Sequence, residues 1–162
     1  PHPLRQRNQL WLNDGHGRYQ QVDGGTALAL EEVSRGAAFA DLDNDGDIDI
    51  IVSNNGGPAR IYRNNADPAH WIGIDLRGAA SSPLAFGATV HLDGDPGRHR
   101  RVRTDGSFAS ASDARIVFGL GTVTSPRFIR VDWPDGTRER FGPLAPDRYH
   151  RLVYQQGDPD ER

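Results

Sequence analysis

Asp41-Leu42-Asp43-Asn44-Asp45-Gly46-Asp47-Ile48-Asp49 is the stretch that decides the fold, because its nine residues include five carboxylates. Carboxylates this close repel one another, so ordering them without a compensating charge costs free energy. Acids at alternate positions, a glycine at the sixth and an acid at the ninth are typical of a loop that binds calcium through hard oxygen ligands. We therefore predict a Ca²⁺ site here; the alternative is a solvated acidic turn.

Each acid has an expected role in this site. The expected metal ligands are Asp41, Asp43, Asp45, Asp47 and Asp49. The first three would supply side-chain oxygens, the fourth its backbone carbonyl, and the last would complete the shell directly or through water. The twelfth position, a glutamate in a helical EF-hand, is Val52, within an apolar run that has the composition of a strand. The loop is therefore expected to join two strands, not two helices.

Short alternating segments separated by turn signals surround the loop and predict an all-β protein. The expected strands cover residues 9–12, 18–22, 36–40, 48–53, 59–63, 70–76, 88–92, 98–103, 115–118, 127–133, 137–141 and 148–154. We interpret residues 1–8 as an N-terminal arm and residues 9–66 as one propeller-type blade that contains the inter-strand calcium loop. Residues 67–162 are expected to form a β-sandwich.

Composition excludes several classes of protein. The 162 residues include no cysteine, so disulfides and thiolate metal sites are excluded, and no apolar run is long enough to span a bilayer. The net charge is −3, which does not favour nucleic acid as a partner. The sequence starts at Pro1 and contains no methionine, so we expect either processing, such as removal of a signal peptide, or a piece of a longer chain. Signal-peptide removal agrees with a calcium-rich extracellular location.

The same residues resemble two known families. Residues 9–64, with NQLWLNDGHGRY and RGAAFADLDNDGDIDIIVSNNGGPARIYRNN, resemble one FG-GAP/VCBS repeat, which forms a blade in integrin-type propellers. Residues 70–155, with HWIGIDLRG, AFGATVHL, ARIVFGLG and VDWPDGT, resemble the ASPIC/UnbV domain of cartilage-acidic-protein-like secreted bacterial proteins. The resemblance implies that the five aspartates are calcium ligands and that the second part is β, with no established catalytic residue. The chain departs from the FG-GAP/VCBS pattern in one respect, because the family places several repeats in a row to close a propeller and this chain has a single repeat.

Other candidate sites are weaker. The basic run from Arg98 to Arg103 fits either an anion-binding patch or a solvated strand whose arginines pair with carboxylates, and the neutral charge of residues 67–162 favours the second. Trp71, Trp133 and Tyr154 fit either a sugar-binding platform or core positions, and we favour the core. The six histidines lack the spacing of a zinc site, and the sequence has no G-x-S-x-G nucleophile elbow, so we expect no enzymatic activity.

Together these patterns predict an extracellular protein, secreted or at the cell surface, with a calcium-stabilised structural or interaction role. A lone blade is short of neighbours to cover its faces and edges, so we expect the chain to assemble head-to-tail with copies of itself, as a subunit of a surface fibre. The alternative is a monomeric module, cut from a larger secreted protein, that binds a carbohydrate or protein ligand.

Overall fold

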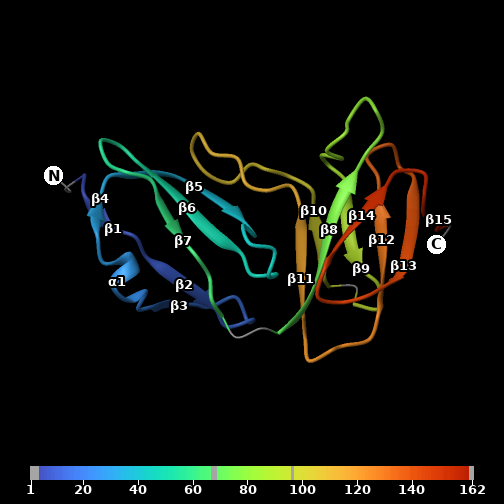
Figure 1. The fold of residues 1–162 in the computed structure, drawn as a ribbon, viewed down its shortest axis with the longest axis horizontal. Helices are drawn as coiled ribbons and strands as arrows, with labels where there is room; N and C mark the ends of the chain where they lie inside the picture. Colours follow the sequence, from blue (N-terminus) through green and yellow to red (C-terminus); the bar gives the residue numbers. More distant parts are fainter. Residues whose placement is uncertain (1–3, 67–68, 96, 161–162) are drawn as a thin grey trace.

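The computed structural model describes residues 4–66, 69–95 and 97–160 of the chain. This part is nearly all β, as the sequence predicted, with one four-residue helix. The strands form two groups that lie beside each other along the long axis (Figure 1). The acidic loop lies where the two groups meet.

The first group contains the sheets on either side of the loop. Its elements are β1 (Gln6–Arg7), β2 (Leu10–Asn13), β3 (Tyr19–Val22), α1 (Gly25–Leu28), β4 (Glu31–Glu32), β5 (Ser34–Ala40), β6 (Asp49–Asn54) and β7 (Arg60–Tyr62). Strands β5, β6 and β7 form an antiparallel sheet in that order, while β2 pairs with β3 and β1 with β4. We call this group the blade; it does not close into a propeller.

The second group consists of two sheets that share one core. Its strands are β8 (His70–Arg77), β9 (Thr89–Leu92), β10 (His99–Arg101), β11 (Ile116–Gly121), β12 (Arg127–Asp132), β13 (Arg138–Leu144), β14 (Tyr149–Val153) and β15 (Asp158–Pro159). One sheet has the order β10-β9-β12-β13-β15 and the other β11-β8-β14, in which β14 runs parallel to β8. We call this group the C-terminal part.

Alternation along the strands builds the core of the C-terminal part. On β8, Ile72 and Ile74 are completely buried, and Ile129 and Val131 on β12 of the other sheet are buried with them. Side chains two residues apart point to the same face of a strand, so both sheets place their apolar sets between them. Every buried member of the core cluster lies between residues 72 and 152.

The blade has almost no core of its own. Among its described residues Val52 is the one buried apolar side chain, whereas Trp11, Tyr19 and Ile61 are 50%, 64% and 67% exposed. The blade therefore leaves large apolar groups in contact with water, an arrangement that is unfavourable unless another surface covers them.

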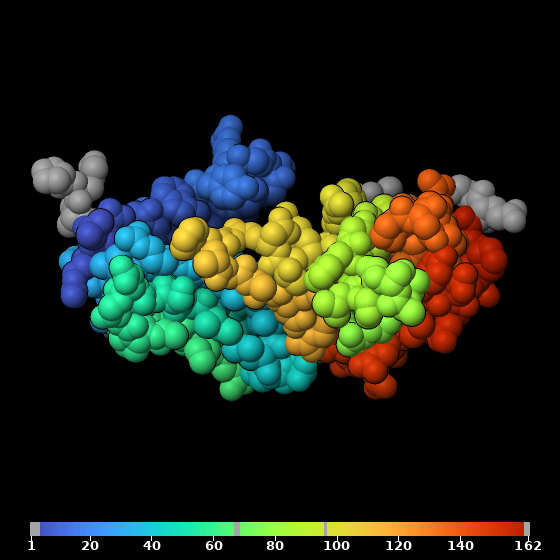
Figure 2. Space-filling model, turned by 90° about the horizontal axis from the view of Figure 1, so that it is seen from above, coloured from blue at the N-terminus to red at the C-terminus, as the bar shows by residue number. Residues whose placement is uncertain are grey.

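A serine-rich segment of the C-terminal part covers one open edge of the blade. The backbone N–H of Ala37 on β5 donates to Ser107 Oγ at 3.0 Å, and that of Phe39 donates to Ser112 Oγ at 3.2 Å. The N–H of Asp113 donates to the Phe39 carbonyl at 2.9 Å. In Figure 2 this yellow segment lies against the cyan strands of the blade. An uncovered edge strand exposes unpaired backbone groups, so these bonds protect β5.

Two expectations differ from the structure in detail. Gln6–Arg7, within the expected arm, pair with Glu31–Glu32, so this part of the arm lies on its own chain, while residues 1–3 lie outside the described residues. The strand expected over 98–103 is shorter, His99–Arg101, although the Val102 N–H still donates to the Ala88 carbonyl at 2.8 Å.

Among the described residues, the structure contains no helix with the length and hydrophobicity that crossing a membrane requires.

Candidate functional site: the acidic loop

The acidic loop connects the antiparallel strands β5 and β6, which meet with Ala40 opposite Asp49. Asn44 and Gly46 take positive φ angles of 62° and 93°, which turn the chain back within a few residues. A Cβ atom on Gly46 would lie 2.3 Å from atoms of the Trp71 indole. Gly46 is thus required both by the turn and by the close approach of the loop to β8.

Three of the five predicted ligands converge. Carboxylate oxygens of Asp41, Asp43 and Asp49 lie within 4.8 Å of one another. Calcium binds oxygen ligands at roughly 2.3–2.6 Å, so oxygens on opposite sides of one ion are separated by about this distance. Asp41 and Asp49 are only 2% and 1% exposed, whereas Asp43 is exposed. The donor set and its spacing therefore fit a hard divalent cation.

The two buried carboxylates are held by backbone N–H groups. Asp41 accepts a hydrogen bond from Gly46 at 2.9 Å. Asp49 accepts one from Leu42 at 2.9 Å and one from Asn64, in the segment after β7, at 2.8 Å. These bonds set the orientation of each carboxylate before any ion binds.

The remaining predicted ligands lie at the margin of the group. Asp45 is exposed, and its Oδ1 accepts a hydrogen bond from the Asp47 N–H at 2.9 Å. Burial, together with the neighbouring negative charge of Asp45, raises the pKa of Asp47. Arg63 pairs with Asp43 and lies 4.0 Å from Asp45, so one guanidinium offsets part of the negative charge.

The C-terminal part contacts the loop directly. The Tyr149 hydroxyl donates to Asp41 Oδ2 at 2.7 Å, and Arg115 donates to the Asp41 carbonyl at 2.7 Å and to Asn44 Oδ1 at 2.6 Å. The Arg115 guanidinium lies 4.3 Å from the centre of the Tyr149 ring, which also meets Trp71 edge-on at 5.1 Å. The loop is therefore part of the joint between the two groups of strands.

Tyr149 is fitted to its role as a donor. Its burial and its hydrogen bond to Asp41 raise its pKa well above that of a free tyrosine. The hydroxyl therefore stays protonated at neutral pH and donates a hydrogen bond to the Asp41 carboxylate. Neither Tyr149 nor Arg115 was identified from the sequence, because each lies in an ordinary strand pattern and becomes part of the site only through folding.

The other predicted site residues are not brought together. Trp71 and Trp133 are buried, as the core interpretation predicted, and Tyr154 meets Trp133 edge-on at 5.1 Å, while Trp71 contacts Tyr149. No sugar-binding platform of all three forms. Of the histidines, His91 pairs with Asp132 at 2.9 Å.

The basic run only partly follows the interpretation we favoured. Arg98 pairs with Asp95 at 3.9 Å and also donates to a backbone carbonyl. The side chains of Arg100, Arg101 and Arg103 are exposed and make no ion pair or hydrogen bond among the described residues. Pairing with nearby carboxylates therefore does not explain most of this run.

Comparison with known proteins agrees with the two-part architecture. Residues 4–52 match an FG-GAP-like repeat, and residues 78–159 match the ASPIC and UnbV family, in the order that the sequence motifs indicated. A search of curated proteins finds no match. The FG-GAP-like match contains the acidic loop, and the second match contains Arg115 and Tyr149, which contact it. Because the second match covers half of its residues, the chain belongs to the ASPIC and UnbV family, with an FG-GAP-like repeat preceding that domain.

Proposed function

We propose that this chain is an extracellular, calcium-stabilised structural and interaction protein that assembles with copies of itself, as a subunit of a surface fibre. FG-GAP repeats are typically extracellular and suggest interactions with other proteins. The observation that carries the proposal is the exposed apolar surface of the blade, where Trp11, Tyr19 and Ile61 lie uncovered.

Calcium is the cation that the loop suits best. FG-GAP repeats often bind calcium, and the convergent oxygens of Asp41, Asp43 and Asp49 are all hard carboxylate ligands. Asp45 and the backbone of Asp47 would complete the shell. A bound ion would offset the charge of the two buried aspartates and hold the loop against the C-terminal part, so its role is structural.

Self-assembly follows from the surfaces that the chain leaves open. The serine-rich segment protects β5, but β7 forms the other edge of its sheet. Repeats of this type bury their apolar faces against neighbouring repeats, and a second copy supplies such a neighbour. In this proposal the blade surface packs against a different surface of the next copy, so the contact is head-to-tail, which builds a filament unless the rotation closes a ring.

Two further points complete the proposal. The shared core of the two C-terminal sheets supports the predicted β-sandwich.

We also propose that the chain has no hydrolase or transferase activity. The rings of His70 and His91 each bind an aspartate, and among the described residues no hydroxyl nucleophile is hydrogen-bonded to either ring.

Analytical ultracentrifugation and electron microscopy of the full chain in roughly millimolar calcium test the assembly. We expect particles larger than one chain, which Trp11→Ser and Ile61→Ser reduce to monomers. Val123→Ser is the matched control, because Val123 is an exposed apolar residue outside the blade, in the turn after β11. Monodisperse single-chain particles of the unaltered protein at every concentration would contradict self-assembly and favour the monomeric ligand-binding module.

A further inference from the structure

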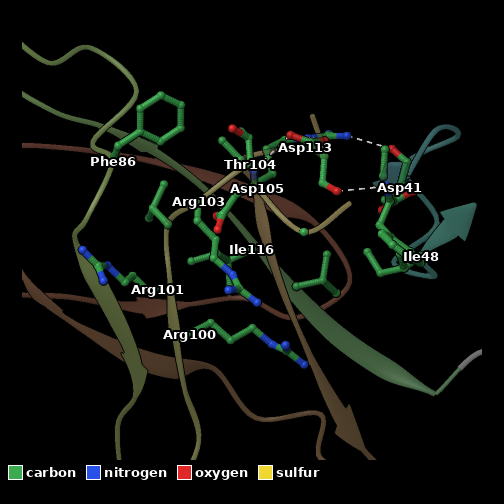
Figure 3. A pocket seen from close by; sticks show the side chains of 18 of the residues that line it. Asp41, Ile48, Phe86, Arg100, Arg101, Arg103, Thr104, Asp105, Asp113 and Ile116 are labelled. Carbon is green, nitrogen blue, oxygen red and sulfur yellow. Dashed lines mark hydrogen bonds and ion pairs between the residues drawn. The ribbon is translucent and has the colours of Figure 1, made fainter. Parts of the chain in front are cut away.

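A cleft of about 1060 Å³ opens between the blade and the C-terminal part. Ile48 of the blade lies on one side, and β10, the segment after it and the start of β11 lie on the other (Figure 3). Phe39 of the blade is also part of the lining. Ligand pockets in proteins span roughly 300–1,000 Å³, so this cleft is large enough for several linked sugar units.

More arginines than carboxylates line the cleft. The side chains of Arg100, Arg101 and Arg103 all line it, are exposed and make no ion pair or hydrogen bond among the described residues. Arg115 also lines the cleft, but it is already bound to Asp113 at 2.6 Å. Asp41, Asp105 and Asp113 line it as well, so the four arginines exceed the carboxylates of the lining by one, on a chain whose net charge is −3. A local excess of the opposite sign within a concave surface attracts anions.

The remaining wall is suited to sugar rings. Phe39, Ile48 and Phe86 are large apolar residues that stay partly exposed in the cleft, and Thr104 and Ser112 add hydroxyl groups to its lining. A sugar ring presents C–H groups on its faces and hydroxyls at its rim, so it can contact both kinds of side chain. Carboxylate or sulfate groups on the sugar would match the planar donors of arginine, which bind such anions through paired hydrogen bonds.

Strand β10 disfavours the addition of an extended peptide on its side of the cleft. Strand β10 is the edge of its sheet, but it is only three residues long, His99–Arg101, and all three are exposed. Addition of a peptide strand needs a long regular edge, and short charged edges are a common way to prevent it.

We infer that the cleft binds an acidic polysaccharide, with Arg100, Arg101 and Arg103 holding the carboxylate or sulfate groups and Phe39 and Phe86 contacting the sugar rings. This site lies beside the acidic loop and is separate from the apolar blade surface that we assign to assembly. Failure of either proposal therefore leaves the other standing.

Isothermal titration calorimetry with the full chain tests the inference. Polygalacturonate presents carboxylates, dextran sulfate presents sulfates, neutral dextran presents the sugar without charge, and polyglutamate presents carboxylates on a peptide. We expect one or both acidic polysaccharides to bind, more weakly as salt is added, and neutral dextran not to bind. The stronger of the two acidic probes identifies the group that the arginines recognise.

Matched variants localise the binding. Arg100→Gln with Arg103→Gln should weaken it at least about tenfold, since each removes a charge-assisted contact. Arg18→Gln with Arg35→Gln changes the net charge equally at exposed, unpaired arginines outside the cleft and should leave the affinity unchanged. Phe86→Ala should weaken polysaccharide binding but not any binding of polyglutamate.

Three results would overturn the inference. An equal loss of affinity in the two double arginine variants would mean that the polysaccharide is attracted by overall charge and not by the cleft. Polyglutamate that bound as tightly as both polysaccharides, with no effect of Phe86→Ala, would assign the cleft to an acidic peptide. The third result is that the folded parent protein, which melts at the same temperature as the variants, binds neither acidic polysaccharide at low salt. That result would mean that the cleft is not a polysaccharide-binding site.

Discussion

Replacing Tyr149 by phenylalanine tests the joint between the acidic loop and the C-terminal part. The change removes one hydroxyl group, which donates to Asp41 Oδ2 at 2.7 Å. The aromatic ring stays, and with it the edge contact to Trp71 and the contact with the Arg115 guanidinium. Any loss of stability therefore reports on the hydrogen bond between the two groups of strands.

The expected loss follows from the partners of Asp41. A hydrogen bond to a charged group contributes about 1.5–3 kcal/mol to stability. Asp41 is 2% exposed, so water does not easily replace the lost donor, but its Oδ2 keeps the Gly46 N–H at 2.9 Å. We therefore expect the free energy of unfolding to fall by about 1–2 kcal/mol, around the lower end of this range, because one donor remains. For a chain of this size that lowers the melting temperature by roughly 2–8 °C.

Urea unfolding followed by tryptophan fluorescence measures the change, with Tyr154→Phe as the control. The Tyr154 hydroxyl also donates to an aspartate, Asp135, at 2.5 Å, but this pair is exposed and belongs to one part of the chain. Exposed pairs contribute about 0–1 kcal/mol, so the control should lose less than Tyr149→Phe. Equal losses in the two variants would refute the view that the loop is anchored through Asp41.

Three further predictions concern the loop and the C-terminal part. Chelation of calcium should lower the melting temperature in scanning calorimetry. Asp43→Ala should abolish the difference in melting temperature with and without chelator, whereas the control Asp105→Ala should keep it. Equal melting temperatures of the unaltered protein with and without chelator would contradict a structural ion. Gly46→Ala should lower the free energy of unfolding by roughly 2 kcal/mol or more, because its Cβ would lie 2.3 Å from the Trp71 indole ring. Gly56→Ala also has a positive φ, +70°, but no atom within 4 Å of the added Cβ, so in the same urea assay it should lower the free energy of unfolding by only about 1 kcal/mol. Burial and a neighbouring arginine lower the pKa of His91, so the unfolded state binds its proton more readily; the free energy of unfolding should fall as the pH drops below about 6.5, and a pH series on His91→Asn should show a smaller fall.

The sequence alone determined the features that depend on local pattern. Alternating apolar residues predicted strands, and the spacing of acids from Asp41 to Asp49 predicted a loop of carboxylates between two strands, which β5 and β6 confirm. Such signals are readable because strand periodicity and turn geometry act over a few residues. The division into an FG-GAP-like repeat and an ASPIC and UnbV domain was likewise visible in short motifs.

The tertiary structure alone decided which residues meet. Of the five predicted ligands, only Asp41, Asp43 and Asp49 bring carboxylate oxygens within 4.8 Å of one another. Tyr149 reaches Asp41 across 108 positions of sequence, and Ser107 reaches Ala37 across 70, so no local pattern could indicate either contact. The cleft has the same origin, since its walls come from strands that become neighbours only when the two groups of strands pack together.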